Sequence, residues 1–315
     1  MLQRMGTERS RVAVAVGRRL KGAGDAILGR LFVSLFRAIR LLDRGRTANL
    51  AAFVTRNVGR LLKEHRIGRA NVAAAFPEKS PAEIEAILLG AWDNLGRVAA
   101  EFAHIDRLKI LDPAQPGPPD IVYDEFTLNR FHALRLDGKP ALIFSSHLAN
   151  WELTAYIAAR YKLDAHLLYR RPNLRAVDDA VREARADAMG TLVATGLDAP
   201  VKLLRVLEAG GHVAMLVDQY FVNGVDVTFF GRTCKANPLI AQLARHTEAP
   251  IHGTRIVRLP ERDRFHAEIT GAIAPARDAE GKVDVRGTMQ VITSIIEGWV
   301  REHPEQWLWM HRRWR

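Results

Sequence analysis

The chain contains 315 residues, of which 48% are apolar, 26% charged and 7% aromatic. A chain of this length buries a large core without help from disulfides or a metal ion. Its single cysteine, Cys234, excludes a disulfide framework and a multi-cysteine zinc site. No uninterrupted run of about 18 apolar residues occurs, which excludes an ordinary polytopic membrane protein.

The positive charge is concentrated at the N-terminus. Residues 1–75 hold 16 basic and 4 acidic side chains, whereas the other 240 residues hold 30 basic and 31 acidic ones, from totals of 46 and 35. A basic N-terminal part on a nearly neutral remainder favours an anionic partner, either nucleic acid or a membrane surface.

Residues 26–42 form one predicted helix of this basic segment. At 100° per residue, Arg30, Arg37 and Arg40 fall within a sector of about 80°, and seven large apolar side chains spread over the opposite side. This pattern is typical of a helix that lies in a bilayer interface beside anionic lipids, and a helix packed on the protein's own core is the alternative. The three arginines disfavour a transmembrane helix, and the segment lacks the small-residue cleavage site of a secretory signal.

The next predicted element is a long amphipathic helix that reaches Phe102. Ser80 and Glu83 form a capping box around Pro81, which predicts where this helix begins. Residues 112–120 contain four prolines and are a predicted connector between the N-terminal helices and the rest of the chain.

Beyond the connector, strands and helices alternate. Strands are expected at 140–146, 164–169 and 211–217, helices at 151–160, 173–189, 201–208, 237–247 and 287–302, and a strand pair at 250–258 and 264–273. This alternation predicts an α/β fold with a largely parallel central sheet flanked by helices, preceded by an N-terminal amphipathic, membrane-associated helical segment. In such sheets the chemistry collects at the carboxyl ends of strands, which selects residues 145–152 and 218–219.

His147 and Glu152 are the first candidate catalytic pair. They lie just past a predicted strand and in the first turn of the next helix. If Glu152 accepts a hydrogen bond from one ring nitrogen of His147, the other nitrogen becomes a general base for an alcohol. A purely structural role for His147 is the alternative.

The motifs that are missing narrow the reaction type. The sequence has no G-x-S-x-G elbow, no P-loop, no G-x-G-x-x-G after a strand and no H-E-x-x-H pattern. A base without a protein nucleophile predicts that the hydroxyl of the substrate itself attacks, while the enzyme positions the reactants and stabilises an oxyanion.

Five ordered sequence blocks resemble one protein family, the late acyltransferases of lipid A biosynthesis (lauroyl and myristoyl transferases) within the lysophospholipid acyltransferase superfamily. The blocks are Arg69-x-Asn71 with Phe76-Pro77-Glu78, His147 to Glu152 as an H-x4-E motif, Tyr169-Arg170 with Arg185, Asp218-Gln219 with Phe229-Phe230-Gly231, and Pro304 to Arg313. They cover about 245 residues, so they are more specific together than any single motif.

The resemblance implies transfer of an acyl chain from acyl carrier protein to a hydroxyl of a lipid A precursor, at the cytoplasmic face of the inner membrane. It implies that His147 is the base and Glu152 its orienting partner, and that no metal or organic cofactor is needed. It further implies that the substrate is bound by Asn150, Arg170, Arg185, Asp218 and Gln219.

Several of these assignments have alternatives. Arg182 could take the place of Arg185, Asp218 could cap a turn, and Asn150 could only shape its loop. The C-terminal tryptophans Trp307, Trp309 and Trp314, beside Arg312 and Arg313, could anchor the chain at a membrane interface or pack on the core.

The charge distribution and the resemblance together predict a basic membrane-associating helical segment, residues 1–75, and an acyltransferase domain, residues 76–315. Members of the family usually begin with a transmembrane helix, so the arginines at 30, 37 and 40 favour peripheral attachment to an anionic membrane surface instead. Two rival functions remain: a related acyltransferase acting on another glycolipid or glycerolipid, and a non-enzymatic protein that binds an anionic surface or nucleic acid. No nucleic-acid-binding signature is present, so nucleic acid is not an expected partner.

Overall fold

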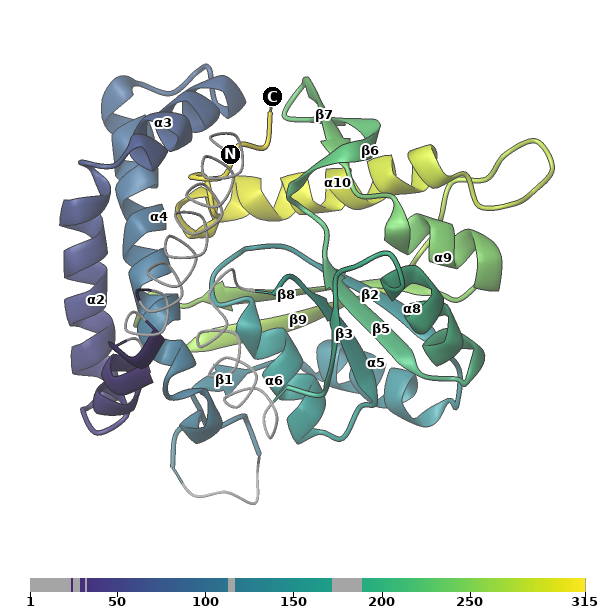
Figure 1. Ribbon diagram of the computed structural model, residues 1–315, viewed down its shortest axis with the longest axis horizontal. Helices are drawn as coiled ribbons and strands as arrows, with labels where there is room; N and C mark the ends of the chain where they lie inside the picture. Colours follow the sequence, from purple (N-terminus) through teal and green to yellow (C-terminus); the bar gives the residue numbers. More distant parts are fainter. Residues whose placement is uncertain (1–23, 25–28, 32, 113–116, 172–188, 315) are drawn as a thin grey trace, which may run out of the picture.

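The computed structural model describes residues 24, 29–31, 33–112, 117–171 and 189–314 (Figure 1). Arg185 lies outside the described residues, as does nearly all of the helix expected at 173–189.

A seven-stranded sheet forms the centre of the molecule, with the strand order β1-β9-β8-β2-β5-β3-β4 (Figure 1). All neighbouring strands run parallel except β8 and β9, which form the antiparallel pair expected from the sequence. The α/β prediction with a largely parallel sheet is therefore confirmed. The strands are β1 (Ile121–Val122), β2 (Ala141–Ser145), β3 (Ala165–Tyr169), β4 (Thr191–Ala194), β5 (His212–Leu216), β8 (Ile251–Arg258) and β9 (Phe265–Ile273).

Helices cover both faces of the sheet, because successive side chains of a buried strand point to opposite faces. Leu142 and Phe144 of β2 pack into one large core with the helices of one face, whereas Ile143 packs into a smaller cluster on the other. The first face carries α8 (Ala199–Glu208), α9 (Leu239–Thr247) and α10 (Val285–Glu302), and the second carries α5 (Glu125–Leu136) and α6 (Glu152–Arg160).

Between residues 44 and 102, three α-helices precede the sheet and stand at its edge (Figure 1). They are α2 (Arg44–Gly59), α3 (Lys63–Ala75) and α4 (Pro81–Phe102). The capping box of Ser80 and Glu83 is confirmed at the start of α4. Val72 and Phe76 share a hydrophobic core with Leu88 of α4 and with side chains of the sheet, so α3 and α4 are packed onto the part of the chain that forms the sheet.

A two-stranded antiparallel hairpin, β6 (Tyr220–Phe229) and β7 (Arg232–Ala236), leaves the sheet just after β5. The sequence analysis did not predict this hairpin or helix α5. Both lie in stretches without a clear apolar period, and β6 contains an irregularity between Tyr220 and Val225.

The described turns of the predicted helix at 26–42 are helical up to residue 39. Phe36 packs its ring 6.0 Å from that of Phe102, and Arg40 makes two hydrogen bonds to Asp106 at 3.0 and 2.8 Å. One of the three arginines therefore faces the protein rather than a lipid. Among the residues the structure describes, no helix is both long and apolar enough to cross a bilayer.

Candidate active site

Two parallel strands bring His147 and Asp218 together. Strand β2 pairs with β5 in a register that sets Ser145 beside Leu216. The chain therefore leaves both strands at the same edge of the sheet, and two residues further along each strand the side chains of His147 and Asp218 meet. This is the edge where the sequence analysis placed the chemistry.

Both carboxylate oxygens of Asp218 accept hydrogen bonds, two from His147 and one from Trp307. Its Oδ1 lies 2.7 Å from Nδ1 of the imidazole, and its Oδ2 accepts hydrogen bonds at 2.8 Å from the backbone N–H of His147 and from Nε1 of Trp307. The carboxylate is buried. Three hydrogen bonds on one buried carboxylate fix both the position of the histidine and its ring orientation.

The second ring nitrogen of His147 faces the amide of Gln219. Nε2 lies 3.2 Å from the amide nitrogen Nε2 of Gln219. If that amide donates, the imidazole Nε2 accepts. Nδ1 then carries the ring proton and donates a hydrogen bond to Asp218. This tautomer leaves Nε2 as the basic atom.

The electrostatics of the pair support a charged carboxylate and a basic imidazole. Burial opposes protonation of His147, but the charge and hydrogen bond of Asp218 and the charge of Glu152 raise the pKa of the imidazole above its ordinary value of 6.5. Burial would also raise the pKa of Asp218, yet the charge of the imidazole and the hydrogen bonds from His147 and Trp307 lower that pKa to about 2.

The carboxylate hydrogen-bonded to the imidazole of His147 is that of Asp218, whereas the sequence analysis expected that of Glu152. The hydrogen bond to Nδ1 comes from the end of β5, whereas Glu152 opens α6 and lines the cleft beside the histidine. Glu152 acts on His147 through its charge. Trp151 packs its ring 5.0 Å from the imidazole and closes one side of it.

An open cleft of about 680 Å³ lies in front of the histidine. Its lining combines the carboxyl ends of strands β2, β3 and β5 with the start of α6 and of β6. Of the residues expected to bind substrate, Arg170 and Gln219 line this cleft, and Arg170 is exposed. The exposed guanidinium is free to meet an anion from solution.

A small apolar cavity of about 70 Å³ adjoins the cleft, between α5, α6 and the sheet. The two share six lining residues: Ile143, Thr154, Ala155, Leu167, Ala214 and Thr254. Five alanines line the cavity, at positions 155, 158, 165, 214 and 267. Small side chains at these positions leave the space open, and the aromatic rings of Phe131 and Tyr161 line it as well.

Asn150 has a different position from the one expected for a substrate-binding residue. It is completely buried and donates from Nδ2 to Glu101 at 2.9 Å. Glu101 in turn receives two hydrogen bonds from Arg258, at 2.5 and 2.9 Å. Asn150 thus shapes the loop after β2 through a buried ion pair, which was the alternative interpretation.

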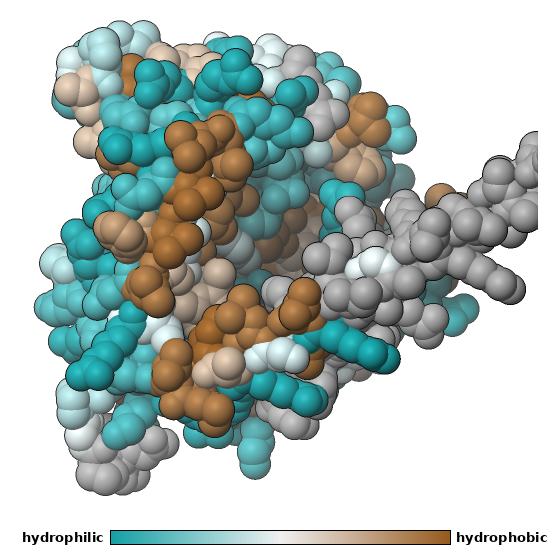
Figure 2. Space-filling view, turned by 60° about the vertical axis from the view of Figure 1, so that its left-hand side comes forward, coloured by the Kyte–Doolittle hydropathy of each residue, from teal (hydrophilic) through white to brown (hydrophobic). Residues whose placement is uncertain are grey.

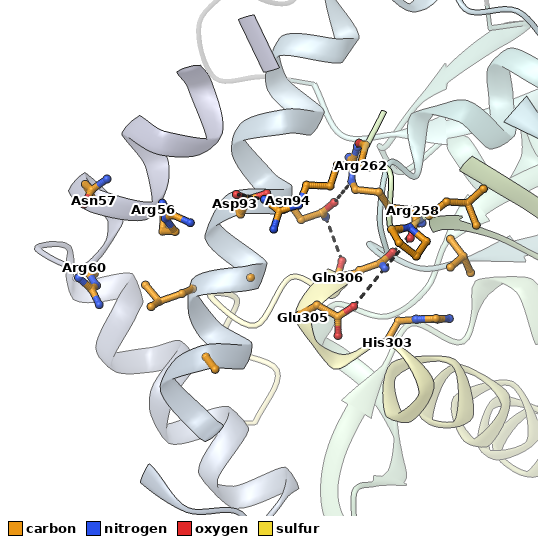
Figure 3. Close-up of a pocket in the computed structure, with 16 residues that line it drawn as sticks. Arg56, Asn57, Arg60, Asp93, Asn94, Arg258, Arg262, His303, Glu305 and Gln306 are labelled. Atoms are coloured by element: carbon orange, nitrogen blue, oxygen red, sulfur yellow. Dashed lines mark hydrogen bonds and ion pairs between the residues drawn. The ribbon is translucent and has the colours of Figure 1, made fainter. Parts of the chain in front are cut away.

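Gln306 joins the same buried network. Arg258 donates to Asn94 at 3.0 Å, and its backbone exchanges two hydrogen bonds with the side chain of Gln306. Figure 3 shows Asn94, Arg258 and Gln306 of this network at the edge of a second hollow. Arg56 of α2 and Arg60, just beyond its end, lie on the far side. This hollow has a volume of about 830 Å³.

The C-terminal segment holds the histidine loop in place. Leu308 donates its N–H to the carbonyl of His147 at 3.2 Å, and Ala149 donates to the carbonyl of Gln306 at 2.9 Å. Trp307 and Trp309 are almost completely buried, and Arg313 is buried as well. The C-terminal tryptophans therefore pack on the core, and the indole of Trp307 reaches the carboxylate of Asp218.

Four of the five sequence blocks meet at this segment. Asn71 donates to the carbonyls of Trp309 and His311, each at 2.8 Å. The rings of Phe76, Phe229 and Phe230 pack edge to face or tilted against Trp307 and Trp309, with centroids 5.5 to 5.9 Å apart. The aromatic residues of these blocks therefore pack around Trp307 and Trp309, and Trp307 contacts Asp218.

Trp307 is the residue whose role the sequence analysis missed. Its indole donor was visible in the C-terminal block, but nothing in the sequence connects it with a carboxylate 89 residues away. Among the described residues, no group of three or more His, Cys, Asp or Glu side chains lies close enough together to hold a metal ion.

A histidine with one nitrogen held by a buried carboxylate and the other at an open cleft is suited to remove a proton from a hydroxyl. The adjoining cavity is small and apolar, and both features are compatible with an acyltransferase site. The family model described as bacterial lipid A biosynthesis acyltransferase matches residues 25–315, so the chain belongs to that family. A search of curated proteins finds no significant match. The protein is an acyltransferase of lipid A biosynthesis, as its sequence blocks predicted.

Proposed function

We propose that this protein transfers a fatty acyl chain from acyl carrier protein to a hydroxyl of a lipid A precursor, with His147 as the general base. The observation that carries the proposal is the arrangement at His147: Asp218 holds Nδ1 at 2.7 Å, and Nε2 is left as an acceptor beside the cleft. Family membership supplies the lipid A precursor and the acyl transfer.

The reaction begins when the acceptor hydroxyl displaces the amide of Gln219 from Nε2 of His147. His147 takes the hydroxyl proton as the oxygen attacks the thioester carbonyl of the acyl donor, which gives a tetrahedral oxyanion. When the carbon–sulfur bond breaks, the imidazolium returns the proton to the leaving thiolate. The products are an ester on the acceptor and a free thiol on the carrier, so protons and bonds balance.

Two carboxylates support the imidazolium that forms in this reaction. Asp218 orients the ring and stabilises its positive charge through a direct hydrogen bond. Glu152 lies at the cleft and adds negative charge nearby, so its contribution is electrostatic. In this assignment Asp218 takes the orienting role that the family resemblance gave to Glu152.

The substrates have separate places in the proposed complex. Arg170 at the rim of the cleft binds either the oxyanion or a phosphate of the acceptor. The alanine-lined cavity between α5 and α6 receives the far end of the acyl chain, because it is apolar and adjoins the cleft but is too small for the whole chain. Arg185 is retained as a substrate-binding candidate on the resemblance alone. The protein works at the cytoplasmic face of the inner membrane, attached through its N-terminal segment, where both substrates are within reach.

The lipid A of a strain lacking the gene tests this proposal. Mass spectrometry should show lipid A lacking the mass of one acyl chain, restored by the wild-type gene and not by His147→Ala. Lipid A of unchanged mass in the deletion strain would overturn the proposed acceptor.

A further inference from the structure

The inner face of α2 is made of small side chains. Ala48, Ala52 and Gly59 are buried against α4, and Thr55 donates to the carbonyl of Trp92 at 2.7 Å. A Cβ on Gly59 would clash with the ring of Trp92. The two helices are therefore in close contact, and this contact fixes which side of α2 faces outward.

The outer face of α2 is made of large apolar side chains. Leu50 is 63% exposed and Phe53 59%, and Val54 and Val58 are each nearly half exposed. Leu61, just beyond the helix, is 84% exposed. Figure 2, which brings this side of the molecule forward, shows apolar side chains gathered in an upright band. A helix that faces water carries its large apolar residues on the inside, so α2 has the opposite distribution.

Exposed apolar residues continue in the segment before α2. Leu31 and Leu35 are about three-fifths exposed, and Leu41 and Leu42 are exposed as well. The apolar surface therefore extends from the predicted interfacial helix at 26–42 onto α2, which belongs to the same predicted membrane-associating segment, residues 1–75.

The charge around this surface is positive. Residues 29–75 contain ten basic and two acidic side chains. Arg40 and Arg44 are occupied by Asp106 and Asp120. Arg46 and Arg56 of α2 are exposed, and no ion pair is formed by either within the part of the chain that the structure describes. Their charges remain available to an anionic partner outside the protein.

We propose that the outer face of α2 is a bilayer-contacting surface, with Leu50, Phe53 and Val54 entering the interface and Arg46 and Arg56 meeting anionic lipid headgroups. A bilayer fits better than a protein partner because apolar side chains and unpaired arginines alternate on one exposed helix, which is the pattern of interfacial helices. The proposal rests on the proposed function and deepens it, because it names the outer face of α2 as the part of residues 1–75 that contacts the membrane.

An environment-sensitive fluorophore tests the contact directly. Phe53→Cys is labelled with NBD (nitrobenzoxadiazole), and Leu197→Cys, fully exposed in the loop before α8, is the matched control. The native cysteine, Cys234, is buried and should react little. Vesicles of phosphatidylcholine with phosphatidylglycerol should shift the emission at position 53 to the blue and leave position 197 unchanged. Vesicle binding without a shift at position 53 would overturn the proposal and assign attachment to residues 1–28.

Flotation of the full chain with the same vesicles tests the apolar and basic parts separately. Leu50→Gln/Val54→Gln should weaken binding at least about tenfold, whereas Leu136→Gln/Leu197→Gln, on other exposed sites, should not. Arg46→Gln/Arg56→Gln should weaken binding by about fivefold for each arginine, and only when phosphatidylglycerol is present.

The alternative occupant of this face is a second copy of the chain. Sedimentation without vesicles should give the same mass for wild type and Leu50→Gln/Val54→Gln. A wild-type dimer that the variant lacks would overturn the proposal. Acyl transfer to detergent-dispersed acceptor should be unchanged in this variant, so failure of the membrane proposal and failure of the proposed function give different results.

Discussion

The catalytic edge of the sheet and the outer face of α2 are built in opposite ways. At the sheet edge, a buried carboxylate and an imidazole find their partners within the chain, from Trp307 to Gln219. On α2, large apolar side chains and arginines face outward without such partners among the described residues. The geometry of His147 is therefore set by contacts within the chain, whereas the proposed partner of the outer face of α2 is a bilayer.

Removal of the base should have the largest effect on this self-contained site. His147→Ala should lower kcat by about 10²- to 10⁴-fold, because the hydroxyl proton then loses its acceptor at the cleft. His246→Ala, on α9, is the matched control and should keep wild-type turnover. Steady-state acyl transfer measures both, and a fully active His147→Ala would exclude this residue as the base.

The next effect separates the two carboxylates. Asp218→Asn should lower kcat by about 10²-fold or more, because the amide cannot stabilise the same tautomer and imidazolium. Glu152→Gln should lower it by about tenfold or less, because its action is through charge alone. The reverse order of these two variants would return the orienting role to Glu152.

The pH dependence of kcat/KM gives a second readout of the same pair. The carboxylates raise the pKa of His147, so the acidic limb of the wild-type profile should lie above pH 6.5. Glu152→Gln removes a negative charge, lowers that pKa and should move the limb to lower pH. A limb that stays in place would show that Glu152 has no charge effect on the base.

Changes in the alanine-lined cavity should alter the choice of substrate more than the rate. Ala158→Leu fills the cavity and should lower kcat/KM for the longest accepted acyl chain by about tenfold relative to a chain two carbons shorter. Ala159→Leu, the next residue on α6, does not line the cavity and is the control. Competition between acyl donors of two lengths measures the ratio, and an unchanged ratio would place the acyl chain elsewhere.

The smallest expected effect concerns the indole that holds Asp218. Trp307→Phe removes a hydrogen bond to a buried carboxylate and should lower the free energy of unfolding by about 1.5–3 kcal/mol. Trp314→Phe, whose indole donates to a backbone carbonyl at 3.3 Å, should cost less. Denaturant unfolding compares the two variants. Equal losses in the free energy of unfolding would show that the hydrogen bond to the Asp218 carboxylate stabilises the protein no more than one to a backbone carbonyl.

Apolar periodicity was enough to predict five strands of the sheet, β2, β3, β5, β8 and β9, and helices α4, α6, α8, α9 and α10. The short edge strands β1 and β4 and helices α2, α3 and α5 were not predicted. The strand at 140–146 and the one at 211–217 are continuous apolar runs, as expected for strands buried on both faces. Hairpin β6–β7 escaped prediction because β6 is largely exposed and interrupted at Gly224. Exposed strands of this kind carry no clear period.

The sequence predicted where in the sheet the candidate site lies, but not which carboxylate is hydrogen-bonded to His147. His147, Glu152 and Asp218 were all selected because they follow strands or open a helix. Which carboxylate reaches Nδ1 depends on the register of β2 against β5, and on a C-terminal indole, which a single sequence does not reveal. Asn150 was placed in the site by its motif, whereas its burial depends on the ion pair between Glu101 and Arg258.

The most direct test of the central claim is transfer of labelled acyl chains from acyl carrier protein to purified lipid A precursor, with wild type beside His147→Ala and Asp218→Asn. The account predicts transfer by the wild type and its near loss in both variants, all three being folded. Wild-type turnover in His147→Ala, or no transfer by the wild type at any chain length, would contradict it.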